Sequence, residues 1–368
     1  MDAVVIAAGG TGGHLYPALA VAGELARLAP GLSVEFTGGA AGLEARVVPA
    51  ESWPFTPFES APWHRGRPLS MLTGGVRALR GAWRAKGWLR AKRARAVFST
   101  GGFPGAPVLL AAAAARIPIV LHEPNLRAGI VNRVFGRVAA CVTVGDEAAA
   151  GSFPRTRVRV TGVPVRRSVL EGDRARGRRM LGIEDEAFVV LVLGGSQGAS
   201  AINRAVAEAL PRLGSPGGPL SLVWLCGRAG EPAASAVADT APVPVRVFGY
   251  LDDMASALAA ADLVVARAGA STLAELSATG HPAILVPYPH AAADHQSRNA
   301  EAFARAGAAI VIPETELSGE RLAAGIAALA GDRERLNTMA RRSSALGRPD
   351  AARAVAQAIL ETIGVPAA

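Results

Sequence analysis

The 368-residue chain has few of the residues that build crosslinks or metal centres. Its two cysteines, Cys141 and Cys226, each lie in a short apolar run, so we expect buried reduced thiols rather than a disulfide. No group of His, Cys, Asp and Glu has metal-site spacing, and Asp252-Asp253 is not a convincing metal motif. A Walker loop and a G-x-S-x-G nucleophile elbow are also missing. We therefore expect neither a metal nor a cofactor.

Long apolar segments are missing as well. The longest uninterrupted one, residues 106–115, is too short to span a bilayer. The first residues, MDAVVIAAGG, carry no basic segment before their apolar run, so no signal peptide is expected. With 50% hydrophobic and 19% charged residues, the chain should fold without crosslinks, and its length suffices for two cores. We expect a soluble protein of the cytoplasm.

Acidic residues are absent from one window, which runs from Ser60 to His122 and contains eleven basic residues. Outside it, 28 basic residues face 30 acidic ones, so the net charge of +9 arises inside the window. Residues 68–96 can form a helix with an apolar stripe and a basic flank. The stripe is Leu72, Val76, Leu79 and Trp83, and the flank is Arg77, Arg80 and Arg84.

Two interpretations of this helix stay open. It is either an ordinary amphipathic helix packed on a core, or a surface that docks on an anionic membrane, where each basic residue contributes about 1 kcal/mol. Nucleic acid is not expected as a partner, because the segment has no recognisable reading motif and the charge elsewhere is slightly negative.

Strand-like apolar runs alternate with helical stretches along the whole chain. The expected strands are Val4–Ala8, Val34–Thr37, Ala96–Ser99, Pro118–Leu121, Val142–Val144, Val158–Thr161, Phe188–Leu193, Leu222–Cys226, Val245–Phe248, Leu263–Ala266, Ala283–Val286 and Ala309–Ile312. This alternation predicts an α/β protein whose parallel sheets are covered by helices on both faces.

The pattern also restarts. VVIAAGGTGG (4–13) and VVLVLGGSQGA (189–199) are both apolar strands that run into a glycine-rich turn and a helix. We therefore expect two Rossmann-like domains, joined near 161–167. The first comprises residues 1–163 and a closing helix within 348–368, and the second comprises residues 164–347. Ligands of such domains bind outside the carboxyl ends of the strands.

Three glycine-rich loops follow strands, at 9–14, 99–105 and 194–199. Backbone N–H groups in such loops can point at an anion, with a helix N-terminus behind them, so we expect phosphate or diphosphate binding. A dehydrogenase fits poorly, because Gly10-x-Gly12-x-x-Leu15 lacks the third glycine of the dinucleotide fingerprint. Glu35, the acid nearest to the expected distance of roughly twenty residues, lies in the middle of a strand rather than at its end.

Polar residues cluster at further strand ends. They are His122, Glu123, Asn125, Arg166, Glu275, Asp294, Gln296 and Asn299. Each also has an ordinary structural explanation. Thr272 and Glu275 have the spacing of a capping box, Asp294 can be an N-cap, and His122 can be a core histidine. Together they fall at the ligand-binding ends of both domains.

A set of motifs occurs in one order over nearly the whole chain: GGTGGHLYPALAVA, STGGFPGAP, LHEPN, GVPVR, GGSQGA, YLDDM, AGASTLAE and DHQSRNA. In this order they resemble the peptidoglycan N-acetylglucosaminyltransferases of glycosyltransferase family 28. The resemblance implies the GT-B fold, with two Rossmann-like domains facing a cleft. It implies inverting, metal-free transfer of GlcNAc from UDP-GlcNAc to the 4-hydroxyl of undecaprenyl-pyrophosphoryl-MurNAc-pentapeptide (lipid I), giving lipid II. It also implies peripheral attachment at the cytoplasmic face of the bacterial membrane, through the segment near Trp83.

The resemblance assigns the donor to the second domain. Glu275 matches the acid that takes the ribose hydroxyls, the backbone of Leu251 meets the uracil, and Gln296 contacts the sugar. Ser196 and Arg166 match residues near the phosphates. The implied donor loop is Ala270, Ser271, Thr272, Leu273, Ala274 and Glu275.

The resemblance assigns the acceptor side to the first domain. The residues that reach the GlcNAc are Thr11, Gly12, Gly13, His14 and Asn125, and those that hold the acceptor diphosphate are Gly101, Gly102 and Gly105. His14 is the first candidate for the general base, with an orienting role as its alternative, and Glu123 is the next candidate. Three departures from the family pattern are Phe103, Pro124 and Val163. A different GT-B transferase, a sugar-nucleotide epimerase and a silent nucleotide-sugar binder stay open as alternatives.

Overall fold

The computed structural model describes residues 1–59, 68–194, 198–214, 218–291 and 294–366, with only the backbone given for 68–79. The chain forms two compact units. The first unit is Met1–Arg166 with Arg348–Ala368, and the second unit is Arg167–Gly347. The boundary therefore lies after Arg166, slightly beyond the boundary at 163/164 that the sequence suggests.

The first unit is built on a parallel sheet of seven strands in the order β3-β2-β1-β4-β5-β6-β7. The strands are β1 (Ala3–Ala7), β2 (Ser33–Gly38), β3 (Phe55–Pro57), β4 (Ala94–Ser99), β5 (Ile119–Glu123), β6 (Cys141–Val144) and β7 (Val158–Val160). Strand β3 was not expected from the sequence, because its short run is bounded by Pro54 and Pro57. Prolines are tolerated here because β3 is an edge strand.

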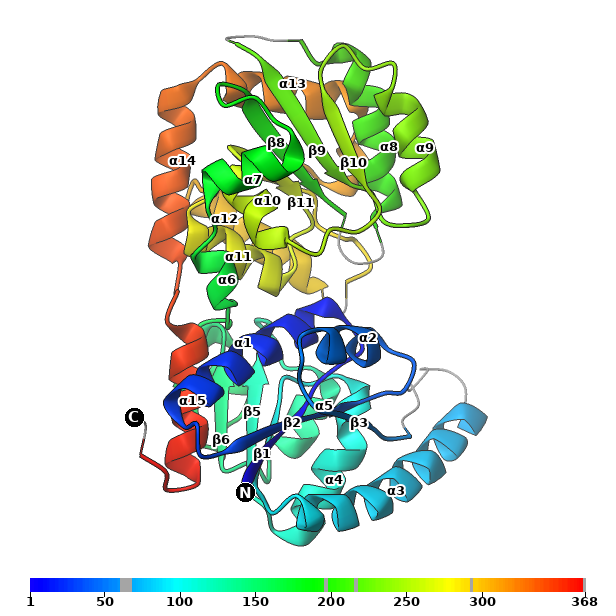
Figure 1. Cartoon of the computed structure of the whole chain (residues 1–368), viewed down its shortest axis with the longest axis vertical. Coiled ribbons are helices and arrows are strands. Elements are labelled where there is room, and N and C mark those ends of the chain that lie inside the picture. The colour runs from blue at the N-terminus through cyan, green and yellow to red at the C-terminus, as the bar shows by residue number, and fades with distance from the viewer. Residues whose placement is uncertain (60–67, 195–197, 215–217, 292–293, 367–368) are drawn as a thin grey trace. The chain divides into compact units, whose positions relative to one another are not determined.

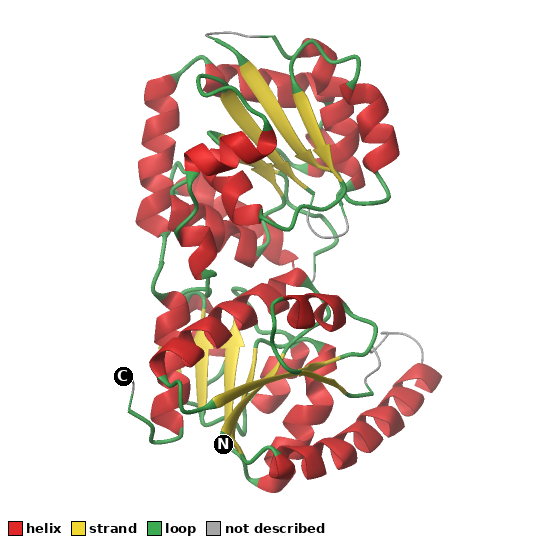
Figure 2. Cartoon of the chain, viewed as in Figure 1, coloured by secondary structure: helices red, strands yellow, loops and turns green. Residues whose placement is uncertain are grey.

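Helices cover both faces of this sheet (Figures 1 and 2). One face carries α1 (Gly12–Leu28), α2 (Leu43–Ala50) and α15 (Ala351–Thr362), and the other carries α3 (Pro68–Ala91), α4 (Ala106–Ala115) and α5 (Ile130–Phe135). Alternate side chains of β1 serve the two faces, since Val4 and Ile6 pack with the first group and Val5 and Ala7 with the second. The expected closing helix is α15, which packs against α1.

The second unit contains a parallel sheet of six strands in the order β10-β9-β8-β11-β12-β13. The strands are β8 (Phe188–Leu193), β9 (Leu220–Leu225), β10 (Val245–Phe248), β11 (Leu263–Ala266), β12 (Ala283–Leu285) and β13 (Ala309–Val311). All twelve expected strands are therefore present, and the prediction of an α/β protein with parallel sheets is confirmed.

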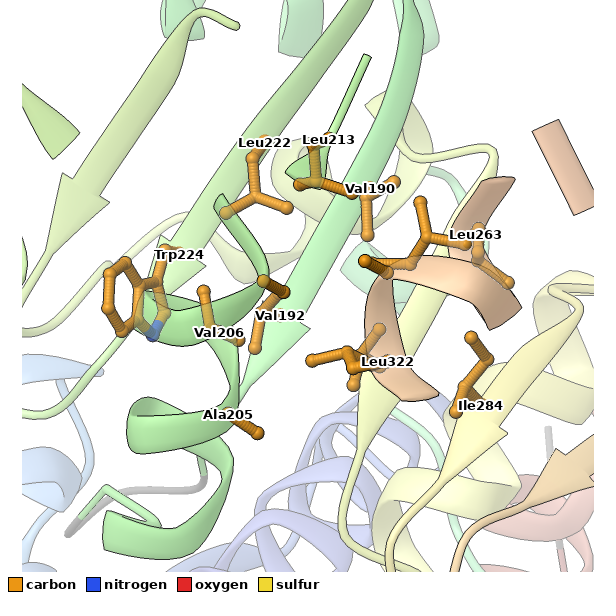
Figure 3. Close-up of a cluster of buried hydrophobic side chains, with 14 of the residues drawn as sticks. Val190, Val192, Ala205, Val206, Leu213, Leu222, Trp224, Leu263, Ile284 and Leu322 are labelled. Atoms are coloured by element: carbon orange, nitrogen blue, oxygen red, sulfur yellow. The ribbon is translucent and has the colours of Figure 1, made fainter. Parts of the chain in front are cut away.

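The helices of the second unit are α6 (Arg167–Leu170), α7 (Arg174–Leu181), α8 (Ser200–Ala209), α9 (Glu231–Ala238), α10 (Met254–Ala260), α11 (Ala270–Thr279), α12 (His295–Arg305), α13 (Gly319–Ala330) and α14 (Arg333–Leu346). Figure 3 shows part of the core, in which Val192 and Trp224 of the sheet lie against Val206 of α8. The buried indole of Trp224 donates a hydrogen bond to Asn203 Oδ1 at 3.1 Å, so its one polar atom is satisfied.

In each sheet the chain first adds strands toward one edge and then, from one point on, toward the other edge. In the first unit β1 lies between β2 and β4, so the reversal is between β1 and β4, and in the second unit it is between β8 and β11. Loops that follow the two strands at such a reversal leave in opposite directions and open a crevice, which is where open α/β sheets bind ligands. The glycine loops at 9–14 and 99–105 follow β1 and β4, and the one at 194–199 follows β8.

Cys141 and Cys226 are buried free thiols, as the sequence analysis expects. Burial raises the pKa of both thiols, which keeps them in the unreactive protonated form. Among the described residues, no helix is both long enough and apolar enough to cross a membrane.

Candidate functional site

His14 lies in the first turn of α1, just beyond β1, and is bonded to the end of β4 in both directions. Its Nδ1 is 2.8 Å from the carbonyl oxygen of Thr100, and Thr100 Oγ1 donates to the His14 carbonyl at 2.7 Å. A carbonyl only accepts hydrogen bonds, so Nδ1 carries the hydrogen and the lone pair of the neutral ring is on Nε2. The backbone of Thr100 therefore holds the ring in the tautomer that a general base needs.

The two glycine loops of the first unit are in contact at this reversal. Gly102 has a φ of +83°, and a Cβ placed on it would lie 2.6 Å from the Gly9 carbonyl oxygen and 3.4 Å from His14 Cδ2. Only glycine permits this approach. The structure thus brings together eight residues that the sequence analysis assigned separately: Thr11, Gly12, Gly13, His14, Asn125, Gly101, Gly102 and Gly105 all follow β1, β4 or β5, which are neighbours in the sheet.

The start of α1 has the features of an anion site. Thr11 is the N-cap and makes no side-chain capping bond, and the first turn contains no acidic residue. The first N–H groups of a helix have no partners within the helix and carry a partial positive charge. This end of the sheet can therefore hold a phosphate group close to His14.

Glu123 ends β5 and is 1% exposed. Its Oε1 accepts from the backbone N–H and the side-chain amide of Asn125, at 3.0 and 3.1 Å. Its Oε2 accepts from Gly129 N and from Asn132 Nδ2, both at 2.9 Å. Both oxygens are thus occupied in shaping the loop at 124–129, which favours a positioning role for Glu123 over proton transfer.

Asn132 on α5 is a buried residue that the sequence analysis missed. Its Nδ2 donates to Glu123 Oε2 and, at 3.0 Å, to the carbonyl oxygen of His122. A Cβ on Gly101 would lie 3.2 Å from the same amide, so Asn132 connects β5 to the loop after β4. No sequence signal identifies it, because its partners are nine and ten residues away and come close only in the fold.

His122 is fully buried in β5, in agreement with the core-histidine interpretation. Thr143 Oγ1 donates to the Leu121 carbonyl, so it accepts from His122 Nδ1 at 2.9 Å. His122 Nε2 has no hydrogen-bond partner among the described residues. Burial, followed by the nearby His14, lowers the pKa of His122 to about 3, so this imidazole is neutral at physiological pH.

Arg166 is the last residue of the first segment of this unit and packs inside it. Its guanidinium carbon lies 4.6 Å from the centre of the Tyr16 ring, and Nη1 lies 3.6 Å from Glu51 Oε1. Its side chain is 18% exposed, so the aromatic ring and the carboxylate limit where the charge can point. The expected contact of Arg166 with a phosphate stays a prediction.

In the second unit, α11 follows β11 at the sheet reversal, and its N-cap is Gly269. The capping-box explanation of Thr272 and Glu275 is therefore ruled out, because Thr272 lies within the helix and Glu275 lies in its second turn. The helix begins early because glycine is itself a good N-cap and adopts the required extended conformation. The implied donor loop, Ala270 to Glu275, is thus the half-buried first part of a helix. Its N-cap, Gly269, has no side chain that could cap it.

Two further residues of the second unit shape the loops around α11. Asn299 is buried and donates to the Ala268 carbonyl at 3.1 Å, and Gln296 Oε1 accepts from Tyr288 N at 3.0 Å. Asp294 occupies the N-cap of α12, as expected. However, its side chain accepts from Ser297 Oγ at 2.6 Å and does not cap a backbone N–H.

Arg267 is another residue that the sequence analysis missed. It donates from Nη1 to the carbonyls of Val286 and Pro287, at 3.2 and 3.3 Å, and pairs with Glu314 at 2.5 Å. It therefore ties the carboxyl end of β11 to the end of β12. Its position directly after an apolar strand and before a glycine was a signal that the sequence analysis did not use.

The remaining predicted residues are placed as follows. Leu251 is half-buried in the loop after β10, and Asp253 in the same loop caps α10 by accepting from Ser256 N at 3.0 Å. Ser196 lies outside the described residues. Within the described ranges, no group of His, Cys, Asp and Glu could hold a metal ion.

Comparisons with known proteins agree with this arrangement. The N-terminal domain of glycosyltransferase family 28 matches residues 4–144, and its C-terminal domain matches residues 189–355. The UDP-N-acetylglucosamine–N-acetylmuramyl-(pentapeptide) pyrophosphoryl-undecaprenol N-acetylglucosamine transferase of Desulforudis audaxviator is 42% identical, over 95% of both chains. The transferase of the same name from Moorella thermoacetica is 40% identical, over 98% of this chain and 99% of its own.

Among solved structures, MurG of Acinetobacter baumannii superposes with a TM-score of 0.73. It is 29% identical in sequence, and the match covers 98% of this chain and 99% of that one. Both halves of the chain therefore match one known protein in order and over almost their entire length.

The buried neutral state of His122 makes the first unit sensitive to acid. The unfolded chain binds a proton near pH 6.5 and the folded one only near pH 3, so stability falls as the pH decreases through this interval. Between pH 7 and pH 4.5 we expect His122 to account for a loss of about 2–3 kcal/mol in the free energy of unfolding. In urea titrations at both pH values, His122→Asn should lose less stability than the wild type. Equal losses would contradict the prediction.

Proposed function

This chain belongs to glycosyltransferase family 28, and we propose on that premise that it moves GlcNAc from UDP-GlcNAc to the 4-hydroxyl of undecaprenyl-pyrophosphoryl-MurNAc-pentapeptide. Its two parallel-sheet domains are those of a GT-B glycosyltransferase. The observation that carries the proposal is the position of His14, which is held in one tautomer on the glycine loop at the sheet reversal of the first unit.

The chemistry of the transfer explains why this site needs both an anion loop and a histidine. In an inverting transfer the acceptor hydroxyl attacks the anomeric carbon from the face opposite to UDP. The hydroxyl proton must leave as the new bond forms, and the departing diphosphate must be stabilised. We assign the proton to Nε2 of His14 and the acceptor diphosphate to the glycine loops on either side, which include Gly101, Gly102 and Gly105.

We assign the donor to the carboxyl edge of the second sheet. The start of α11, whose N-cap is the glycine Gly269, supports binding of the diphosphate, because its N–H groups and dipole favour negative charge. Glu275, half-buried one turn further along, is the acid for the ribose hydroxyls. The remaining residues keep the roles that the resemblance implies. Leu251 is assigned to the uracil and Gln296 to the sugar, while Ser196 and Arg166 are both assigned to the phosphates.

We further propose that the first unit attaches to an anionic membrane surface at its cytoplasmic face, with no role for nucleic acid. On α3, Trp83 is 81% exposed while Ala85 and Leu89 are buried, so the tryptophan lies off the face that packs on the core. Arg80 and Arg84 are exposed beside it. The side chains of the other stripe residues, Leu72, Val76 and Leu79, and of Arg77 on the flank lie outside the described part of the structure.

Helix α5 extends the same type of surface. Ile130 and Val134 of α5 and Val138 in the turn after it are 46%, 49% and 60% exposed, at intervals of four residues. Arg133 and Arg137 are exposed between them. Helices α3, α4 and α5 pack on the same face of the sheet, so their outer surfaces are available to one partner. Exposed apolar residues interspersed with arginines fit an anionic lipid surface.

The transfer itself is tested by incubating the protein with UDP-GlcNAc and a short-chain, water-soluble lipid I analogue. Formation of the disaccharide product and UDP supports the proposal. Formation of UDP-ManNAc would identify an epimerase instead, and donor that is bound but unchanged would identify a silent binder.

For His14→Ala we expect kcat to fall by about 10²–10⁴, because a base acts only in the transition state. The Kd of UDP-GlcNAc, measured by calorimetry, should stay nearly unchanged. Thr100→Val is the matched control, since it removes the bond to the His14 carbonyl but keeps the imidazole, and its kcat should fall much less. Loss of donor binding with an unchanged kcat would reassign His14 to recognition.

For Glu275→Ala we expect the donor KM to rise about 10- to 100-fold, because a charged acceptor to two hydroxyls contributes about 1.5–3 kcal/mol. The acceptor KM and the melting temperature should change little. Glu301→Ala, which removes an exposed carboxylate from α12, is the control. A lower melting temperature with an unchanged donor KM would contradict the assignment.

For the membrane surface we expect the wild type to sediment with vesicles rich in anionic lipid, less so at high salt, and not with neutral vesicles. Changing Arg77, Arg80 and Arg84 together to Gln should remove on the order of 3 kcal/mol of attraction. Turnover of the soluble acceptor should survive, while turnover of the long-chain acceptor in vesicles should fall. Trp83→Ala should act in the same direction but more mildly.

The control for this charge change is the replacement of three exposed arginines of α14, Arg333, Arg335 and Arg341, by Gln. It removes the same net charge from the second unit and should leave vesicle binding intact. If the wild type and the α3 variant sediment equally with anionic vesicles, α3 is an ordinary amphipathic helix packed on the core and not a membrane surface.

A further inference from the structure

We propose that Glu44 is a positioning residue for the glycine loop that carries His14. This inference rests on the proposed transfer reaction, because it assigns the residue that keeps the acceptor side of that site in place. Glu44 lies in the first turn of α2, is fully buried, and belongs to none of the motifs that the sequence analysis identified.

The carboxylate of Glu44 joins two loops. Its Oε2 accepts from Gly10 N at 3.1 Å, in the loop after β1, and its Oε1 accepts from Gly39 N at 2.9 Å, in the loop after β2. Each carboxylate oxygen thus holds one of two neighbouring strand ends. A shift of either loop would break one of these bonds.

Three glycines make room for this carboxylate. A Cβ on Gly9 or on Gly42 would lie 2.3 Å from a carboxylate atom, and one on Gly38 would lie 2.7 Å from Glu44 Cγ. Real side chains do not approach so closely, so the carboxylate fits only because these positions lack side chains. The loop is therefore rich in glycine for two reasons. Its backbone N–H groups can approach an anion on one side, and its lack of side chains leaves room for Glu44 on the other.

The environment of Glu44 on α2 differs from that of Glu35, a buried acid on β2. Glu35 is neutralised by Lys92, at 2.7 Å. Among the described residues, by contrast, no cationic side chain forms an ion pair with Glu44, and the hydrogen bonds it accepts come from backbone N–H groups. A buried charge held by backbone dipoles depends on their exact placement, and in turn it resists their movement.

The consequence for the reaction follows from chain connectivity. Gly10 adopts a φ of +90°, and His14 follows four residues later on the same turn. If Gly10 is released, the start of α1 can shift relative to Thr100, and the His14 ring shifts with it. We therefore expect the loss of Glu44 to affect acceptor binding and turnover, but not the binding of UDP, which we assign to the second unit.

The first test is Glu44→Gln. The amide offers an acceptor to one of the two N–H groups and opposes the other with its own NH₂, so one loop is released without a change in size. With the short-chain acceptor we expect at least a tenfold fall in kcat, a raised acceptor KM and a Kd for UDP within twofold of the wild type. Glu35→Gln on β2 is the matched control, because it also neutralises a buried acid but leaves the loop bonds intact.

The second test keeps the charge and displaces it. Gly42 has a φ of −82°, which alanine adopts without strain, so the methyl group of Gly42→Ala acts only by pressing on the carboxylate. We expect the same phenotype as for Glu44→Gln. Gly23→Ala on α1 is the control, since no heavy atom lies within 4 Å of the added Cβ.

Hydrogen exchange of the peptide that covers residues 9–14 provides a readout that does not need activity. Exchange should rise in Glu44→Gln and Gly42→Ala and stay at the wild-type level in both controls. If the wild type makes no disaccharide, the proposed function fails while exchange still decides the role of Glu44. The inference would be overturned if both variants had the same kcat, acceptor KM and hydrogen exchange as the wild type. So would an equal loss of UDP binding and acceptor binding, which would indicate a general structural role.

Discussion

The paired hydrogen bonds between His14 and Thr100 are the contacts on which the arrangement of loops at the carboxyl edge of the first sheet depends. They connect the residues that follow β1 and β4, the two strands between which the sheet order reverses. A reversal separates the loops on its two sides and leaves a crevice, which gives space for a ligand but also gives the loops freedom to move apart. The two hydrogen bonds hold the loop after β1 to the loop after β4. One of them also determines which ring nitrogen of His14 carries the hydrogen.

Buried acids provide the second level of support. Glu44 and Glu123 both lie at the carboxyl edge of the first sheet, and both accept hydrogen bonds from backbone N–H groups in loops. A carboxylate is well suited to this task, because each of its oxygens can accept more than one hydrogen bond and charge-assisted bonds are strong. The loops of the site are therefore held in shape by acids that lie behind them. The surface in front of them can remain free of negative charge.

The sequence predicts the layers of this fold well and its polar interior poorly. Strands such as Phe188–Leu193 are visible because apolar periodicity is a local property of the chain. The edge strand β3 escapes this pattern because prolines bound its short run, and the capping-box explanation of Thr272 fails because α11 begins earlier, after Gly269. Glu44 and Asn132 carry no local signal at all. Their importance comes from partners such as Gly10, 34 residues from Glu44, which only the folded chain brings near.

The position of α15 has a consequence for how the chain reaches its folded state during synthesis. The second unit is one continuous segment and can fold as soon as Gly347 has left the ribosome. The first unit is different, because Val355 and Ile359 of α15 complete the same core as Val4 and Ile6 of β1. The first segment of this unit therefore cannot complete its core until α15 has been synthesised, and until then the part of the core that α15 covers is exposed to solvent. Transiently exposed apolar surface of this kind is what chaperones bind in nascent chains, and here it is buried only when α15 docks.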